Sequence, residues 1–293
     1  MLEPLREAGR IAAAARGFGA KRIVAGARLF DVCSAVEAEI VRLGGGAAFP
    51  VQSSRNEVAA HYCPAPSDET RYAEGDLAKL DIGVHVDGWV VDTALTVSVG
   101  EHAANARLVA ATEAALRAAI AVAGPGVPVN RLSAEIEATV RACGFKVVRN
   151  IGGHGVGRWM VHGPPPIPNT PDASTTVLEV GAVVAIEPFA TEGAGLVAER
   201  GRAELFRLDP RHPGGAAVPP ALLAAIQGFR GLPFSRRQLG AFAADAVEEA
   251  LKILAVVGGL GAYAPLVEIS GRPVAQTEHT IAVLRDGVEV LTT

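Results

Sequence analysis

Residues 80–97 read LDIGVHVDGWVVDTALTV, and the fold follows from this stretch. Apolar and polar residues alternate on both sides of the Asp-Gly dipeptide at 87–88, which favours a two-residue turn, so the pattern predicts two antiparallel strands. With this turn Gly83 faces Asp92, and Asp81, two residues before Gly83, points to the same face. The two carboxylates are then diagonal neighbours, with about 7–8 Å between their Cα atoms.

This arrangement of Asp81 and Asp92 allows two interpretations. One or two cations could bridge the carboxylates, and Gly83, which has no side chain, leaves room for them. The simpler interpretation is a solvated hairpin face that carries two surface aspartates. The rest of the chain is needed to decide between them.

The composition is that of an ordinary globular protein. Of 293 residues, 49% are hydrophobic and 20% are charged, which is enough for a large core in one or two domains. A net charge of −4 provides no basic surface, so we expect no direct nucleic-acid partner. Cys33, Cys63 and Cys143 are an odd number at wide spacings, which fits neither a disulfide framework nor a zinc finger. With no secretion signal and no apolar run of about 18 residues, the chain is expected to be cytoplasmic and not in a membrane.

The first half of the chain contains a helix pair that recurs in the second half. Residues 3–20 predict one helix, and residues 31–43 predict another, capped by Asp31 and ended by glycines. Shifted by 100 residues, the segment at 26–45 aligns with the segment at 126–145. The aligned identities are Gly26 with Gly126, Glu37 with Glu137, Ala38 with Ala138 and Gly44 with Gly144. Ala-rich helices can align by chance, but the match favours two related halves around a shared sheet.

The second half adds two strands and an unrelated segment. Residues 149–169, RNIGGHGVGRWMVHGPPPIPN, predict a Gly- and Pro-rich loop, and the strand at 183–190 is expected to stop pairing at its proline, just after Glu187. Residues 206–262 have no counterpart in the repeat; they predict an inserted helical subdomain with a long helix at 237–257. A last strand at 274–284, VAQTEHTIAVL, contains Glu278.

Three histidines stand in unusual local contexts: His61 in AAHYCP, His154 in GGHGVG and His162 in MVHGPPP. Most single histidines are packed or exposed without a function, but the glycines on both sides of His154 let its backbone come close to another group. A dinucleotide-binding loop is excluded at 153–157, because the Pro-rich residues that follow cannot form the helix that such a loop requires.

The ordered motifs resemble those of methionine aminopeptidases, the family with the pita-bread fold. The resemblance rests on Asp81 and Asp92 eleven residues apart across an Asp-Gly turn, His154 in GHGVG, Glu187 in IEPFAT and Glu278 in AQTEHT. The insert between the two glutamates, with GLPFSRRQL in it, is similar to type 2 enzymes. The absence of a long charged N-terminal extension resembles the compact archaeal form.

This resemblance implies an α+β pita-bread (creatinase/aminopeptidase) fold with two pseudo-symmetric halves around a central antiparallel sheet. It also implies a single catalytic domain over residues 1–293, with a winged-helix-like insert at about 206–262. The expected activity is removal of the N-terminal methionine from nascent proteins and peptides when the second residue is small. Two positions depart from the family pattern: Thr277 stands where an aromatic residue is usual, and Arg55 lies in the segment beside the substrate.

By similarity, two divalent cations are expected. Asp92 and Glu278 bridge them, Asp81 completes the shell of one, and His154 with Glu187 completes the other. Four carboxylates and one imidazole favour Mn, Fe or Co, with Zn also acceptable, over a thiolate-type zinc centre. Water between two such cations can be hydroxide near neutral pH and can attack the peptide carbonyl.

The remaining roles are also implied by the resemblance. Glu187 is expected to shuttle a proton from the water to the leaving amine. His162 is expected to donate to the carbonyl oxygen, and His61 to contact the scissile amide or the leaving residue. Phe49 and Val161 are expected to line the pocket for the methionine side chain.

Two other functions remain open at this point. A proline-specific peptidase of the same fold would use the same ligands, although those enzymes usually carry an additional N-terminal domain and lack the insert. A non-catalytic relative that binds RNA or the ribosome would be expected to lose ligands, and all five are present here. The expected partners are nascent polypeptide N-termini, with transient ribosome association, and the expected state is a monomer.

Overall fold

The computed structural model describes residues 2–209, 211 and 217–293, so Met1 and part of the predicted insert lie outside the described residues. The helices are α1 (Leu2–Ala20), α2 (Leu29–Arg42), α3 (Ala103–Val122), α4 (Val129–Ala142), α5 (Pro220–Gly228), the 3₁₀ helix η1 (Arg236–Leu239) and α6 (Ala244–Val256). The strands of the first half are β1 (Gly46–Ala47), β2 (Gln52–Arg55), β3 (Val58–Ala60), β4 (Leu77–Val86) and β5 (Trp89–Ser98). Those that follow are β6 (Lys146–Val147), β7 (Gly152–Gly157), β8 (Met160–Pro168), β9 (Val183–Ile186), β10 (Phe189–Thr191), β11 (Val197–Glu199), β12 (Leu205–Leu208), β13 (Leu260–Tyr263), β14 (Leu266–Glu268), β15 (Val274–Gln276), β16 (His279–Leu284) and β17 (Gly287–Val290).

The predicted hairpin forms with the predicted register. Strands β4 and β5 pair antiparallel, with Gly83 opposite Asp92. Asp87 and Gly88 both have positive φ, 52° and 84°, which is the backbone of the two-residue turn that matches the twist of antiparallel strands. On its other side, β4 pairs with β1 and β2, so the hairpin lies inside a sheet and not on a solvated surface.

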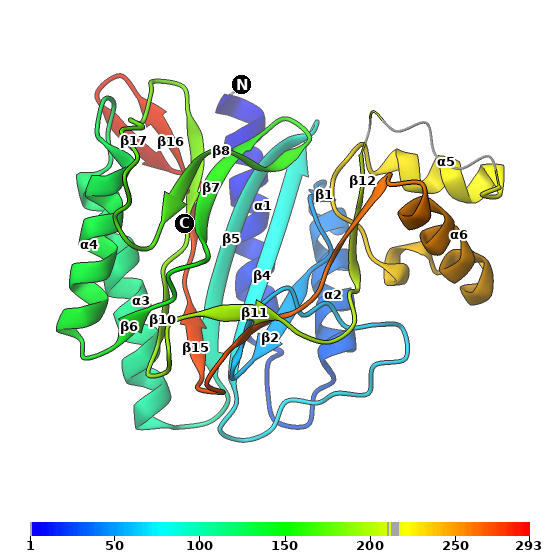
Figure 1. The fold of residues 1–293 in the computed structure, drawn as a ribbon, viewed down its shortest axis with the longest axis horizontal. Coiled ribbons are helices and arrows are strands. Elements are labelled where there is room, and N and C mark those ends of the chain that lie inside the picture. The colour runs from blue at the N-terminus through cyan, green and yellow to red at the C-terminus, as the bar shows by residue number, and fades with distance from the viewer. Residues whose placement is uncertain (1, 210, 212–216) are drawn as a thin grey trace.

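The 100-residue repeat is visible in the backbone. Helices α2 and α4 have the same length and begin 100 residues apart. Gly26 and Gly126 both have positive φ, 86° and 76°, and each donates its N–H to a distant carbonyl, that of Tyr72 or of Leu178. Figure 1 shows α3 and α4 at one end of the molecule, with α1 and α2 behind and beside the hairpin. The prediction of two related halves is therefore confirmed.

One detail of the helix prediction is wrong. Helix α2 begins at Leu29, and Asp31 lies in its first turn and does not cap it. The residue at the cap position is Arg28, whose side chain makes no capping hydrogen bond. An acidic side chain in the first turn interacts favourably with the helix dipole, which explains the misleading signal.

Two antiparallel sheets lie side by side at the middle of the molecule. The first contains β1, β4, β2 and β5, and the second has the order β17-β16-β9-β7-β8. Strand β5 lies against the start of β16, where the Glu278 N–H donates to the Ala94 carbonyl oxygen at 2.9 Å. The side chain of Thr280 donates to the Asp92 carbonyl oxygen at 2.7 Å. At this junction, strand β5 of the first half lies next to the segment that leads into β16 of the second half.

The prediction of a loop at 149–169 is wrong. These residues form the hairpin of β7 and β8, whose register shifts near Gly155. Strand β8 is the last in the order of its sheet, so its prolines need not donate to a neighbouring strand on the outer side. An edge position of this kind cannot be recognised from a Pro-rich sequence alone.

The segment at 206–262 packs around apolar residues of its own. Strands β12 and β13 pair, so the chain leaves and re-enters at one point. Between them α5, η1 and α6 enclose a cluster that includes Phe234 and Leu254, and Figure 1 shows these helices at the edge of the molecule. The single long helix predicted at 237–257 is wrong, because η1 ends at Leu239 and α6 begins only at Ala244.

A buried ion pair fastens this segment to the first half. The Arg237 guanidinium donates to both carboxylate oxygens of Glu37, at 2.6 and 3.1 Å. It also donates to the carbonyl oxygens of Pro64 and Val51, at 2.9 and 3.1 Å. Only 6% of the Arg237 side chain is exposed.

We expect Arg237→Met to lower the free energy of unfolding by about 3–5 kcal/mol, because the Glu37 charge would stay in the interior without its partner. Urea denaturation measures the change. The matched control is Arg131→Met, which removes an exposed pair with Glu135 and is expected to cost less than about 1 kcal/mol. If both variants lowered the free energy of unfolding equally, the buried pair would contribute no more to stability than an exposed one.

Candidate metal centre

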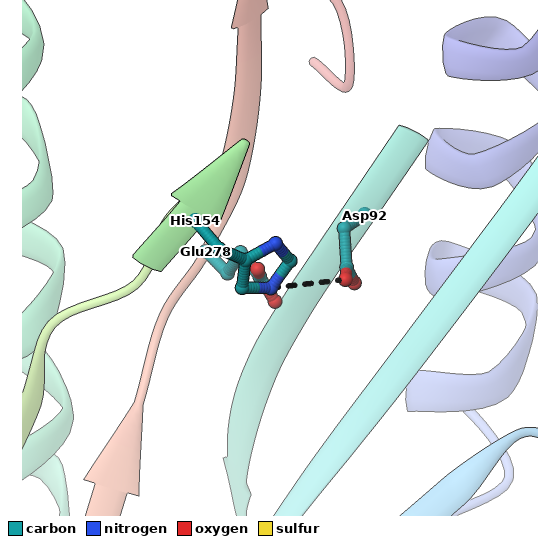
Figure 2. Close-up of side chains that lie close together, drawn as sticks. All are labelled: Asp92, His154 and Glu278. Carbon is teal, nitrogen blue, oxygen red and sulfur yellow. Dashed lines mark ion pairs between the residues drawn. The ribbon is translucent and has the colours of Figure 1, made fainter. Parts of the chain in front are cut away.

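Three side chains from separate segments converge where the two sheets meet. Asp92 lies on β5, His154 on β7, and Glu278 between β15 and β16. One ligand atom from each lies within 4.8 Å of the others, and the His154 Nε2 is 3.7 Å from an Asp92 carboxylate oxygen (Figure 2). Asp92, His154 and Glu278 are only 3%, 9% and 1% exposed. Their geometry is that of a group able to hold a cation.

The other two predicted ligands lie in the same cavity. Glu187 comes directly after β9, and one of its carboxylate oxygens is 3.7 Å from the His154 Nε2. Asp81 lies on β4, two residues before Gly83, which faces Asp92, and it lines the same cavity. The structure thus brings together all five residues that the sequence selected as metal ligands.

The protonation of this cluster reflects its burial. Removal from water raises the pKa of Asp81 to about 7. It also raises the pKa of Asp92, Glu187 and Glu278 well above the usual range, and the neighbouring carboxylates raise them further. Burial lowers the pKa of His154 to about 3, so its imidazole is neutral and can act as a ligand. Several buried acids of like charge are unfavourable unless cations compensate them.

The hydrogen bonds of the cluster leave acceptors free. Among the residues that the structure describes, Asp81 Oδ1, Asp92 Oδ1 and Glu278 Oε1 are buried and have no hydrogen-bond partner. Buried oxygens of this kind are normally satisfied. Carboxylate oxygens and one neutral imidazole are the donor set that divalent Mn, Fe, Co and Zn accept. The residues present therefore fit divalent cations.

Polar residues around the cluster hold its members in place, and sequence reasoning missed them. Gln276 Nε2 donates to Glu187 at 3.1 Å, and the Asp92 N–H donates to Thr280 Oγ1 at 2.8 Å. Thr93 Oγ1 donates to the Glu278 carbonyl oxygen at 2.9 Å and is in contact with Arg16 of α1. Gln276 and Thr280 flank Glu278 within the AQTEHT motif, a signal that was available. Arg16 gave none, because its role depends on a contact with a distant segment.

The glycines around His154 allow a close approach of backbones, as the sequence predicted. A side chain at Gly153 or Gly155 would collide with the carbonyl oxygen of Ala185 on β9 or of Pro164 on β8. The expectation for Gly83 is wrong in one respect. The space beside Gly83, which faces Asp92, is filled by the ring of Phe49.

Two histidines border both the cavity of the cluster and the pocket next to it. The ring centre of His162 lies 4.4 Å from that of His154. His61 has a positive φ of 65°, which is costly for a residue with a side chain and is found mainly at functional positions. Burial, together with His162, lowers the pKa of His61 to about 4, and burial with Arg207 nearby lowers that of His162. Both rings are therefore expected to be neutral at pH 7.

Apolar residues line the same cavity. Phe49 and Val161, which the sequence selected for a side-chain pocket, both border it and are 3% and 5% exposed. Ala60, Leu205 and Pro233 complete the apolar part of its wall.

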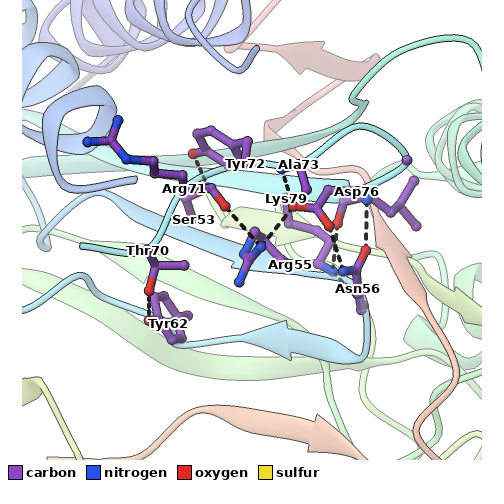
Figure 3. Close-up of polar contacts among 12 residues, drawn as sticks. Ser53, Arg55, Asn56, Tyr62, Thr70, Arg71, Tyr72, Ala73, Asp76 and Lys79 are labelled. Carbon is purple, nitrogen blue, oxygen red and sulfur yellow. Dashed lines mark hydrogen bonds and ion pairs between the residues drawn. The ribbon is translucent and has the colours of Figure 1, made fainter. Parts of the chain in front are cut away.

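Arg55 and Thr277, the two residues that depart from the family pattern, make contacts away from the cavity. Arg55 donates to the carboxylate of Asp76 at 2.9 Å, in the network that Figure 3 shows. Thr277 makes a hydroxyl contact of 2.8 Å with Thr112 of α3. Neither residue lines the cavity.

The raised pKa of Asp81 predicts how the metal-free protein responds to pH. In the unfolded chain this carboxyl ionises near pH 4, but in the folded chain it does so at about 7. Between about pH 4 and 7 the folded state therefore keeps a proton on Asp81 that the unfolded chain has lost. The free energy of unfolding falls as pH rises through this interval. In EDTA, we expect Asp81→Asn to become more stable relative to the unchanged protein from pH 4 to 7, by up to about 1.4 kcal/mol per pH unit, and to level off above. Denaturation at several pH values tests this, with exposed Asp286→Asn as the control; a pH-independent difference would contradict it.

The chain belongs to metallopeptidase family M24, whose model matches residues 3–218. A methionine aminopeptidase of Archaeoglobus fulgidus is 39% identical over 292 residues, which cover 99% of this chain and 98% of that relative. The crystal structure of a methionine aminopeptidase from Thermotoga maritima has a TM-score of 0.74 at 27% identity, covering 99% of this chain and 96% of that one. The structure of a thermophilic Arx1 has a TM-score of 0.86, covering 99% and 90%, but at 20% identity this shows the fold alone.

These similarities identify a metal-dependent peptidase and, among such enzymes, point to methionine aminopeptidases of the archaeal form. The resemblance and the pita-bread fold inferred from the sequence are confirmed. Among the described residues, no helix is both long and apolar enough to cross a membrane.

Proposed function

We propose that this chain removes the N-terminal methionine of polypeptides by hydrolysis, with two divalent cations held by Asp81, Asp92, His154, Glu187 and Glu278. The observation that supports this most is the set of buried carboxylates with unpaired oxygens around one neutral imidazole, facing a cavity. Asp92 and Glu278 each place a ligand atom within 4.8 Å of that of His154, and by similarity to the family they are the proposed bridging ligands.

Divalent cations in this place supply Lewis acidity, which lowers the pKa of water and polarises a peptide carbonyl. Burial and the nearby Asp81 raise the pKa of Glu187, which favours transfer of a proton to its carboxylate and then to the leaving amine. Neutral His162 donates an N–H to the carbonyl oxygen as negative charge develops there. His61, held with its ring in the cavity, contacts the scissile amide or the residue that leaves.

The apolar part of the cavity suits the first side chain of the substrate. Phe49 and Val161 present apolar surfaces to an unbranched thioether, which is flexible enough to fill an irregular space. Pro233 adds to this wall from the segment at 206–262. We therefore regard that segment as an inserted subdomain of a single catalytic domain over residues 1–293.

Peptides that differ in their second residue test the specificity. We expect Met-Ala and Met-Gly peptides to be cleaved, and Met-Leu peptides to be poorer by at least about 1–3 kcal/mol in kcat/KM, because the family resemblance implies that only a small second side chain fits beside the methionine pocket. Peptides with proline in second place and another residue first serve as controls. Preferred cleavage of these controls would indicate a proline-specific peptidase, and no cleavage of any peptide would indicate a binding protein.

The biological setting follows from this activity. The substrates are the N-termini of nascent polypeptides, and we expect the protein to act as a monomer in the cytoplasm, with transient association with ribosomes. Sedimentation of the protein with and without ribosomes at moderate salt tests the monomeric state and the association with ribosomes.

A further inference from the structure

Gln52 has no role in the scheme above, although its side chain lines the cavity with the proposed ligands. It is the first residue of β2 and lies directly opposite Asp81 in the pairing of β2 with β4. The residue before it is held on both sides, because the Val51 N–H donates to Glu37 at 2.9 Å and its carbonyl oxygen accepts from Arg237 at 3.1 Å. The amide of Gln52 therefore projects from a fixed backbone.

The oxygen of this amide is buried and has no hydrogen-bond partner among the described residues. Gln52 is 4% exposed, and among the described residues its Oε1 makes no hydrogen bond. The other amide beside the cluster, that of Gln276, donates to Glu187 through its Nε2. Its Oε1 also has no partner among the described residues, but Gln276 does not line the cavity, whereas Gln52 does. A buried amide oxygen costs free energy unless a donor reaches it, so its environment is incomplete without a ligand.

The position of Gln52 indicates which part of a substrate reaches it. A neighbouring pocket, bordered by Arg207 and Tyr263, shares His61 and His162 with the cavity of the proposed ligands, and Gln52 does not border that pocket. Gln52 borders the cavity of the ligands itself, with Phe49 and Asp81. A polypeptide that enters with its terminus first places its first residue there. That residue has a thioether, which cannot donate, and an amine, which can.

We propose that Gln52 Oε1 accepts a hydrogen bond from the N-terminal amine of the substrate, and that Gln52 thereby contributes to the requirement for a free amino terminus. This inference rests on the proposed function. The amide adds a neutral acceptor beside a strongly acidic cluster, so it can orient the amine without adding another negative charge that the cations would have to balance.

Binding of two ligands that differ only in the amine tests the proposal. Methionine and 4-(methylthio)butanoate share the thioether chain and the carboxylate, and calorimetry with the metal-loaded protein gives both dissociation constants. We expect the protein to prefer methionine and Gln52→Met to reduce this preference by about tenfold to a hundredfold, the usual contribution of a hydrogen bond to a charged group. Gln52→Glu keeps an acceptor and is expected to retain the preference. The matched control is Gln227→Met on the exposed face of α5.

The outcomes separate this proposal from the function on which it rests. An unchanged preference in Gln52→Met, with normal metal content, would overturn the role of Gln52 while Met-Ala cleavage still supported the function. An equal loss of affinity for both ligands would show that Gln52 contacts the side chain and would also overturn it. If Gln52→Met does not fold, Gln52→Glu remains decisive, because loss of the preference there would mean that the amide acts as a donor. Failure of the unchanged protein to cleave Met-Ala peptides would instead reject the proposed function.

Discussion

Asp92→Ala and Glu278→Ala are each expected to abolish cleavage of methionyl peptides and to lower the metal content of the purified protein. Both side chains lie within 4.8 Å of His154 at the centre of the cluster, and both are almost fully buried. A bridging carboxylate that is removed leaves two cations with less negative charge between them, so their mutual repulsion weakens binding of at least one. Elemental analysis and a peptide assay on the same sample measure the two effects.

The control for these variants is Asp286→Ala, which removes an exposed carboxylate in the turn between β16 and β17. It is expected to retain metal and activity. An Asp92 or Glu278 variant that kept two cations and normal turnover would refute the bridging roles.

His162→Ala is expected to reduce kcat by about 10²–10³, the usual loss when one donor to a developing oxyanion is removed. Metal content should stay unchanged, because the His162 ring packs edge-to-face against that of His154 and His162 is not part of the ligand cluster. The control is His102→Ala, an exposed histidine before α3 whose side chain makes no capping hydrogen bond. Loss of metal from His162→Ala would instead identify His162 as a ligand.

The sequence predicted the first hairpin down to the register because two local signals agreed there. Alternation fixes which side chains share a face, and the Asp-Gly turn at 87–88 fixes the pairing. The helix pair was similarly predictable, since α2 and α4 each have an apolar face and a glycine with positive φ on either side. Local physical chemistry is sufficient for such elements.

Other features depend on contacts that no local pattern encodes. Strand β8 contains successive prolines and is a strand only because it occupies a sheet edge. The break between η1 and α6 is set by packing within the insert. Gly83 was expected to leave space, but Phe49, distant in the sequence, fills it.

The site itself shows the same division. Its residue types and motif order were sufficient to select the side chains that meet in the cavity, because each motif resembles a family pattern. The unpaired amide oxygen of Gln52 and the position of Arg16 beside Thr93 and His279 were not predictable. Both are properties of the assembled site, where burial and the absence or presence of a partner determine what a side chain can do.

The central claim is that two divalent cations in this cluster support methionyl-peptide cleavage. The most direct test titrates the EDTA-treated protein with Mn²⁺ or Co²⁺ and follows bound metal and Met-Ala cleavage in the same samples. We predict no activity without metal and full activity when two ions are bound per chain. Full activity with one ion bound, or none at any metal content, would contradict the account.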